Sequence, residues 1–160
     1  MTTDIIESTI KKSIDVKNLI LQEASLIEQI NKVADVCTKS LLAGGKIMLC
    51  GNGGSFADAQ HISAELTSRF LFDRPGLASI ALGTNSSAIT AIGNDYGYEN
   101  VFSREIESMG DSRDVLFALT TSGKSKNILK AIHAAKQKNI VTVAFTGLGR
   151  GNLSASVETL

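Results

Sequence analysis

Apolar residues follow two different rhythms along the chain, and the rhythm changes near residue 45. In residues 4–22 and 25–42 they return every three or four positions, as Ile6, Ile10 and Ile14 do, which predicts two amphipathic helices. Beyond residue 45, short apolar runs at 47–50, 78–82, 114–119 and 140–145 alternate with helical patterns. Such runs between helices are typical of strands buried on both faces. The pattern predicts an α/β fold with a parallel sheet, preceded by a helical pair.

A small sheet does not need both N-terminal helices to cover its faces. They can pack on the sheet, or they can join one subunit to another, and the residues alone favour neither role. We expect residues 1–44 to form this helical region and residues 45–160 to form the domain that contains the sheet.

Composition limits the kinds of partner. The 160 residues include 43% hydrophobic residues, with 16 basic side chains balanced by 16 acidic ones, which predicts a globular domain and argues against nucleic-acid or membrane binding. No apolar run reaches the roughly 20 residues that span a bilayer, and no signal-peptide core is present, so we expect a cytoplasmic protein. Cys37 and Cys50 lie in apolar segments, and we interpret them as buried free thiols rather than redox groups.

The segment 46–70 joins a strand, a glycine-rich turn and a helix. Gly51, Gly53 and Gly54 can adopt backbone angles closed to other residues and let a ligand approach the main chain. Ser55, with Asp58 three residues later, is a candidate N-cap of the helix. In a parallel α/β sheet such a turn lies at the crevice where ligands bind, so we place the site here.

Two better-known phosphate loops are excluded. A dinucleotide fingerprint needs a glycine at Phe56, and a Walker loop that ends at 123–125 needs one at Ala118. The sequence therefore indicates neither NAD nor ATP.

His61 and Glu65 stand one turn apart on the helix that leaves the glycine turn. An imidazole and a carboxylate placed so can hold a divalent metal, or the carboxylate can transfer a proton while the histidine orients or polarises. An isolated pair of this kind is more often a solvated surface pair, and its position after the turn is what favours function.

A second candidate loop is rich in hydroxyl groups and follows the strand at 114–119. It reads Thr120-Thr121-Ser122-Gly123-Lys124-Ser125, and a helix is expected from about residue 127 to 138. N–H groups, hydroxyls and the helix dipole there all suit a phosphate monoester, whereas a plain N-cap turn needs only one hydroxyl. Between the two loops, 93–98 reads as a turn, in which Asn94 and Asp95 are by default ordinary turn formers.

Several motifs in this order resemble one known family. CGNGGSxADAQHxxAEL, IGNDYGY and TSGKS are similar to the phosphoheptose isomerase branch of the sugar isomerase (SIS) domain proteins. The resemblance implies a doubly wound, flavodoxin-like three-layer sandwich, and a homotetramer built by the N-terminal helices with sites at subunit boundaries. It implies interconversion of sedoheptulose 7-phosphate and D-glycero-D-manno-heptose 7-phosphate through an enediol, for bacterial lipopolysaccharide.

The resemblance also assigns roles to individual residues. It implies that Glu65 is the catalytic base and that His61 and Glu65 are zinc ligands. The residues that it implies for substrate binding are Asn52, Gly53, Gly54, Ser55, Glu65, Asn94, Asp95, Thr120, Thr121, Ser122 and Ser125. Many family members have serine at Thr120, a change that keeps the hydroxyl.

The chain departs from the family pattern at its end. Family members continue through a further strand and a terminal helix whose glutamine and histidine complete the metal site, and the printed sequence stops at Leu160. We therefore expect either a fragment or a protein without the full site. Two alternatives to the enzyme are a non-catalytic SIS protein that binds the replication initiator and a sugar-phosphate sensor. Glu65 and Gly54 favour the enzyme over the first.

Overall fold

The structure is a computed structural model that describes residues 2–147 and 153. The chain divides into two units, residues 1–35 and the part that begins at Val36, and each is described by itself. The first contains α1 (Thr2–Gln22) and the start of α2 (Ala24–Leu42), so both predicted helices are confirmed. Ile6, Ile10 and Ile14 of α1 are 61%, 55% and 51% exposed. No helix in the described part of the chain is long and apolar enough to cross a membrane.

The second unit is built on a sheet of four parallel strands in the order β2-β1-β3-β4, as predicted. In chain order its elements are β1 (Ile47–Gly51), α3 (Gly54–Thr67), β2 (Ser79–Ala81), α4 (Ser86–Tyr96), η1 (Tyr98–Asn100), α5 (Val101–Met109), β3 (Val115–Thr120), α6 (Lys126–Gln137) and β4 (Val141–Thr146).

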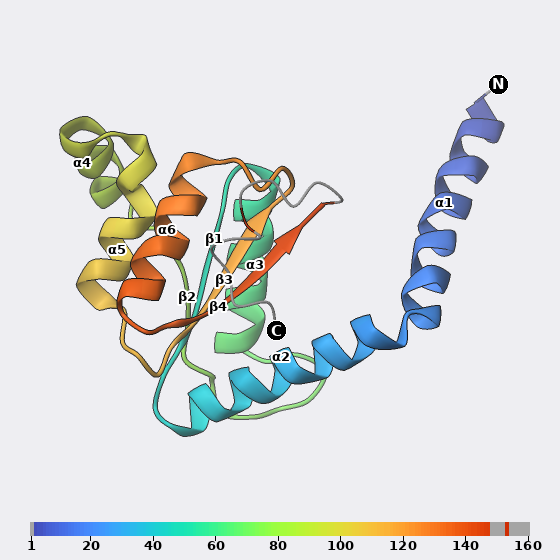
Figure 1. The fold of residues 1–160 in the computed structure, drawn as a ribbon. Helices are drawn as coiled ribbons and strands as arrows, with labels where there is room; N and C mark the ends of the chain where they lie inside the picture. Colours follow the sequence, from blue (N-terminus) through green and yellow to red (C-terminus); the bar gives the residue numbers. More distant parts are fainter. Residues whose placement is uncertain (1, 148–152, 154–160) are drawn as a thin grey trace. The chain divides into compact units, whose positions relative to one another are not determined.

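Helices cover both faces of this sheet. From β1 the chain moves outward to β2 through α3, and from β3 it moves the opposite way to β4 through α6. Because crossovers between parallel strands are right-handed, opposite directions of travel place the helices on opposite faces. Figure 1 shows α3 on one side of the sheet and α5 and α6 on the other. The predicted doubly wound, three-layer architecture is therefore confirmed.

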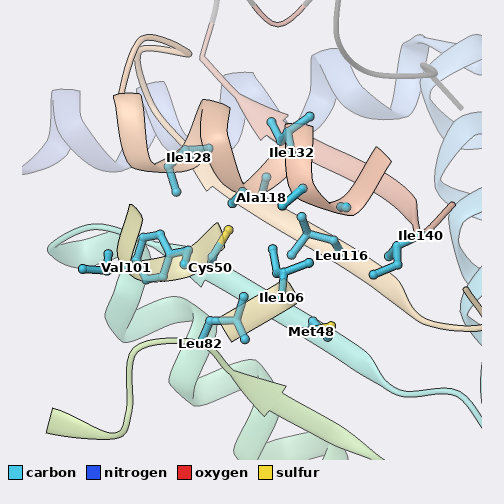
Figure 2. Packing of buried hydrophobic residues seen from close by; sticks show 14 of the residues in the cluster. Met48, Cys50, Leu82, Val101, Ile106, Leu116, Ala118, Ile128, Ile132 and Ile140 are labelled. Atoms are coloured by element: carbon cyan, nitrogen blue, oxygen red, sulfur yellow. The ribbon is translucent and has the colours of Figure 1, made fainter. Parts of the chain in front are cut away.

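The main core lies between the sheet and the layer of α5 and α6. Figure 2 shows the alternate residues Met48 and Cys50 of β1 facing Ile128 and Ile132 of α6, with Ile106 of α5 among them. Burial raises the pKa of the Cys50 thiol to about 12, so this thiol stays protonated. The prediction of a buried free thiol is confirmed at Cys50, whereas Cys37 is free but only half-buried.

Local predictions are wrong at 93–98 and at Thr120. The turn expected at 93–98 is helical as far as Tyr96, because α4 continues to Gly97, whose φ of +87° ends it. Thr120, expected in a loop, is the last residue of β3 and pairs with Thr146 of β4. The glycines at 147, 149 and 151 predict a turn over 146–151, and most of that segment lies outside the described residues.

Candidate functional site

The two predicted ligand loops begin side by side at one edge of the sheet. Gly51 at the end of β1 pairs with Leu119 of β3, so the chain leaves both strands at the same level. Strand order reverses direction between β1 and β3, which makes this the topological switch point of the sheet. Ligands of open α/β sheets bind in the crevice at that point.

The glycine turn after β1 has a backbone that side chains would disturb. A Cβ added to Gly51 would lie 2.5 Å from the carbonyl oxygen of Ser55, and Gly53 has φ +56°. The N-cap of α3 is Gly53 rather than the predicted Ser55, since the helix already begins at Gly54. The N–H groups of Ser55 and Phe56 donate to the carbonyls of Asn52 and Gly53 at 3.1 and 3.0 Å. In the described chain, this leaves the N–H groups of Gly53 and Gly54 for a ligand.

The hydroxyl-rich loop after β3 is partly held by its own hydrogen bonds. The Thr120 hydroxyl is buried and accepts the N–H of Gly123 at 3.2 Å, and the Ser122 hydroxyl accepts the N–H of Lys124 at 3.2 Å. Ser125 is the N-cap of α6, but its hydroxyl caps no N–H group. Thr121 and Ser122 are exposed. The loop therefore keeps hydroxyl donors that face solvent beside the N-terminus of a helix.

A cavity of about 450 Å³ is lined by α3, by the ends of β3 and β4, and by the residues that directly follow these two strands. Ser55, Asp58, His61 and Ile62 of α3 form one wall. The opposite wall consists of Phe117, Leu119, Thr120, Thr121, Phe145, Thr146 and Gly147. The rings of Phe117 and Phe145 stack with centroids 5.6 Å apart. The cavity thus combines apolar side chains with a few polar groups, as small-molecule sites do.

His61 and Glu65 form the predicted pair, with Nε2 and Oε1 3.9 Å apart. The His61 side chain is largely exposed and that of Glu65 is 38% exposed. Residues 55, 58 and 62 follow a helical stripe on α3, and Glu65 continues this stripe one turn beyond the cavity. Glu65 therefore lies on the correct face of α3 but does not line the cavity.

A smaller cavity of about 140 Å³ opens on the other side of the glycine turn. Asn52 and Gly53 line it together with Tyr98, with Gly83 after β2, and with residues from α3, α4 and α5. The Tyr98 hydroxyl donates to Oδ1 of Asn52 at 3.3 Å. Two predicted substrate-binding residues thus border a cavity different from the one that Ser55 and Thr120 line.

Asn94 and Asp95 lie in the last turn of α4, where their side chains are exposed. The Asn94 amide donates to Oδ1 of Asp95 at 2.8 Å. They line neither cavity, and the same is true of Ser122, Ser125 and Gly54. A single chain therefore brings together only part of the predicted site.

Sequence comparison assigns the chain to a family. The SIS domain family model matches residues 14–147, which include every described element from the middle of α1 to β4. A phosphoheptose isomerase from Burkholderia pseudomallei (strain K96243) is 50% identical over 155 residues, 97% of this chain and 79% of that protein. The chain belongs to the phosphoheptose isomerase branch of the SIS domain family. The resemblance read from the motifs is confirmed.

Other phosphoheptose isomerases give the same result. The one from Sulfurimonas denitrificans is 49% identical over 96% of this chain and 78% of its own length. The solved phosphoheptose isomerase structures from Francisella tularensis and Neisseria gonorrhoeae match with TM-scores of 0.92 and 0.89, at 35% and 37% identity. Each match covers 99% of this chain and 82% of the other. The fold of this SIS domain is therefore that of solved phosphoheptose isomerases.

Two buried polar residues of this SIS domain escaped the sequence analysis. Asn127, 4% exposed, lies on the stripe of α6 that also carries Ile128 and Ala131, and it contacts Asn52. Glu105, 8% exposed, lies on the buried stripe of α5 and accepts the N–H of Gly83 at 2.6 Å. A polar residue on an otherwise apolar helical stripe is the signal that identifies both, because burial without a partner is costly.

Proposed function

We propose that this protein isomerises sedoheptulose 7-phosphate to D-glycero-D-manno-heptose 7-phosphate. The observation that carries the proposal is the meeting of a glycine turn and a hydroxyl-rich helix N-terminus at the switch point of a phosphoheptose isomerase-type sheet. One loop suits a phosphate and the other suits a polyhydroxylated chain attached to it. The product would supply heptose for bacterial lipopolysaccharide, and the reaction would take place in the cytoplasm.

Phosphate binding is assigned to the loop before α6. Thr120, Thr121, Ser122 and Ser125 offer hydroxyl donors there, and the dipole of the 12-residue helix favours an anion at its N-terminus. The Thr120 and Ser122 hydroxyls accept hydrogen bonds within the loop, which fixes the oxygen while leaving its own O–H to donate. A phosphate held at one end orients the reacting carbons and lowers the entropic part of the barrier.

Proton transfer is assigned to Glu65. Conversion of a ketose to an aldose removes a proton from C1 and returns one to C2 through an enediol, which needs a base within hydrogen-bonding reach of both carbons. Residues of the glycine turn, Asn52 to Ser55, would hold the sugar hydroxyls, with Asn94 and Asp95 completing the set. Glu65 stands on the helix that leaves this turn, on the stripe that faces the larger cavity.

Zinc is proposed as the cofactor, with His61 and Glu65 as two of its ligands. Nε2 of His61 and Oε1 of Glu65 lie 3.9 Å apart on one helical face, and both are donor types that zinc accepts. Among the described residues no third His, Cys, Asp or Glu joins them, so the pair fits part of a four-ligand site. Bound zinc would polarise the oxygen that gains charge as the proton leaves.

The active assembly is proposed to be a homotetramer built through the N-terminal helices. The exposed isoleucine stripe of α1 supports this, because a 21-residue amphipathic helix gains most of its stability from a covered apolar face. Glu65 and Ser122 line no common cavity within one chain, which also agrees with sites completed by a neighbouring copy.

Charged substitutions in the exposed isoleucine stripe of α1 test the proposed assembly. The double change Ile10→Asp and Ile14→Asp should give a smaller species in analytical ultracentrifugation, with isomerase activity reduced at least tenfold. Lys11→Asp and Asp15→Lys at neighbouring exposed positions serve as controls, since they alter charge outside the stripe. A variant that stays tetrameric, or a monomer with full activity, contradicts the assembly proposal.

Glu65→Gln tests the isomerase itself. Loss of a general base should lower kcat by about 10² to 10⁴-fold, while calorimetry should show sedoheptulose 7-phosphate still binding. Gln60→Ala, on an exposed position of the same helix, is the matched control and should keep full activity. Unchanged turnover in Glu65→Gln would remove Glu65 from the mechanism. A wild-type protein that lacks turnover but retains the replication initiator in a pull-down would support the non-catalytic alternative.

A further inference from the structure

A reciprocal pair of side-chain amides joins the two loops of the site. Nδ2 of Asn52 donates to Oδ1 of Asn127 at 3.0 Å, and Nδ2 of Asn127 donates to Oδ1 of Asn52 at 2.8 Å. Asn52 belongs to the glycine turn after β1, and Asn127 lies in the first turn of α6, directly after the hydroxyl-rich loop. The two residues are 75 positions apart in the sequence. The pair is therefore a tertiary link between the turn and the loop.

Further hydrogen bonds fix the orientation of both amides. Oδ1 of Asn127 also accepts the N–H of Ile128 at 3.0 Å, and Oδ1 of Asn52 also accepts the Tyr98 hydroxyl at 3.3 Å. Each amide oxygen thus has two donors, so neither amide can turn over without losing hydrogen bonds. Within the described chain, one N–H of the Asn52 amide remains without a protein acceptor. Asn52 itself lines the smaller cavity.

We propose that Asn127 is a positioning residue, which holds the Asn52 amide in one orientation and sets the spacing between the glycine turn and the hydroxyl-rich loop. The inference rests on the proposed function, because a ligand that bridges both loops needs that spacing. Asn127 is buried and is not expected to touch the substrate. It acts through Asn52, whose remaining N–H donates to the sugar. Preorganisation of this kind lowers the cost of binding.

Helix capping is the competing explanation for Asn127. Its Oδ1 accepts a backbone N–H in the first turn of α6, which stabilises the helix whatever the ligand. A capping role alone would lower the melting temperature without changing substrate affinity in the folded protein. A positioning role would change affinity, and the change would depend on the presence of Asn52.

A double-mutant cycle separates the two roles. Asn127→Ala, Asn52→Ala and the double variant are compared with wild type by KM, kcat and melting temperature, with Kd for sedoheptulose 7-phosphate from calorimetry. Asn127→Ala should raise KM and Kd about tenfold, with kcat changed less than about threefold. On the Asn52→Ala background, the same change should raise KM less than about twofold, because its effect is transmitted through Asn52. Ile132→Val, buried on the same helix, is the control for destabilised α6 and should leave KM unchanged.

Each result supports or overturns the inference. Equal effects of Asn127→Ala with and without Asn52, or a KM no different from that of Ile132→Val, would overturn it while leaving the isomerase intact. If Asn127→Ala does not fold, Asn127→Asp replaces it, because the carboxylate still accepts the N–H of Ile128 but cannot donate to Asn52. A wild-type protein that neither converts nor binds the sugar phosphate would overturn the proposed function and this inference together.

Discussion

The two edges of the sheet use polar groups in opposite ways. At the amino edge, Asp114 is 1% exposed and accepts the N–H groups of Lys46 and Asp111 and the Lys46 ammonium, at 2.9, 2.8 and 2.6 Å. Hydrogen bonds from Arg113 lower the pKa of neighbouring Asp111 to about 2, so it stays ionised. At the carboxyl edge, the Thr121 and Ser122 side chains are exposed and the Ser125 hydroxyl caps no N–H group. The amino edge is saturated, and the carboxyl edge has hydrogen-bonding capacity to spare.

This difference distinguishes stabilising polar groups from those that can bind a ligand. A buried group whose hydrogen bonds are all used within the protein has nothing left for a substrate, whereas an exposed donor beside a cavity does. We therefore expect substitutions at the amino edge to change stability and substitutions at the carboxyl edge to change binding.

The largest effect is expected from Asp114→Ala. The change removes the buried carboxylate of an ion pair, so two N–H groups lose their acceptor and the Lys46 ammonium keeps only the Met109 carbonyl, which should lower the free energy of unfolding by about 3 kcal/mol. Urea denaturation measures this, and kcat of the folded variant should match wild type. Asp73→Ala, at an exposed site, should stay within about 0.5 kcal/mol. An Asp114→Ala variant that keeps its stability but has an altered KM would contradict the proposed difference between the two edges of the sheet.

Ser122→Ala should have an intermediate effect of the opposite kind. Loss of one hydroxyl donor from the proposed phosphate loop should raise KM about tenfold, equivalent to about 1.4 kcal/mol, with little change in melting temperature because the side chain is exposed. Ser112→Ala, an exposed serine in the turn at the amino edge, is the matched control and should change neither quantity. Unchanged KM in Ser122→Ala would separate that hydroxyl from the phosphate site.

Glu105→Gln should give the smallest effect and should appear only as pH changes. Burial raises the pKa of Glu105 above its usual value, while the N–H of Gly83 lowers it less. The folded protein therefore gains stability from binding a proton at Glu105. This stability is fully present below the ordinary glutamate pKa and is lost as pH rises through the higher pKa of Glu105 in the folded protein. Melting temperature of wild type should fall relative to Glu105→Gln across that range. Glu107→Gln, exposed on the same helix, should show no such difference. Parallel pH curves for wild type and Glu105→Gln would argue that Glu105 stays charged.

Much of the fold could be predicted because apolar runs of strand length separate its helices. Every predicted strand and both N-terminal helices exist, since each depends on a local pattern that burial then reinforces. A turn was predicted at 93–98 because Asn94 and Asp95 have low helix propensity. In the structure α4 continues through both residues and ends at Gly97, so this weak local preference is overridden. The N-cap prediction at Ser55 failed because Gly53, at φ +56°, is the N-cap, so the helix begins two residues earlier than predicted.

The site was harder to predict than the fold. Motifs located the glycine turn and the hydroxyl-rich loop. The register between β1 and β3 explains why the turn and the loop begin at the same level of the sheet. No local sequence pattern predicts that the Asn52 side chain forms hydrogen bonds with Asn127, because that contact joins residues far apart in sequence. Zinc binding and the roles of Glu65, Asn94 and Asp95 stay predictions.

The pairing of the central strands β1 and β3 is delayed during protein synthesis, because β3 is made long after β1. Lys46 and Asp114, which flank the paired starts of β1 and β3, are separated by 68 residues. At about 5–20 residues per second, a ribosome needs about 3–14 s to make that interval. Over those seconds β1 can pair with β2 but not with β3, so one side of an apolar strand stays uncovered on the nascent chain. Chaperone binding during translation should therefore peak before β3 emerges and decline afterwards.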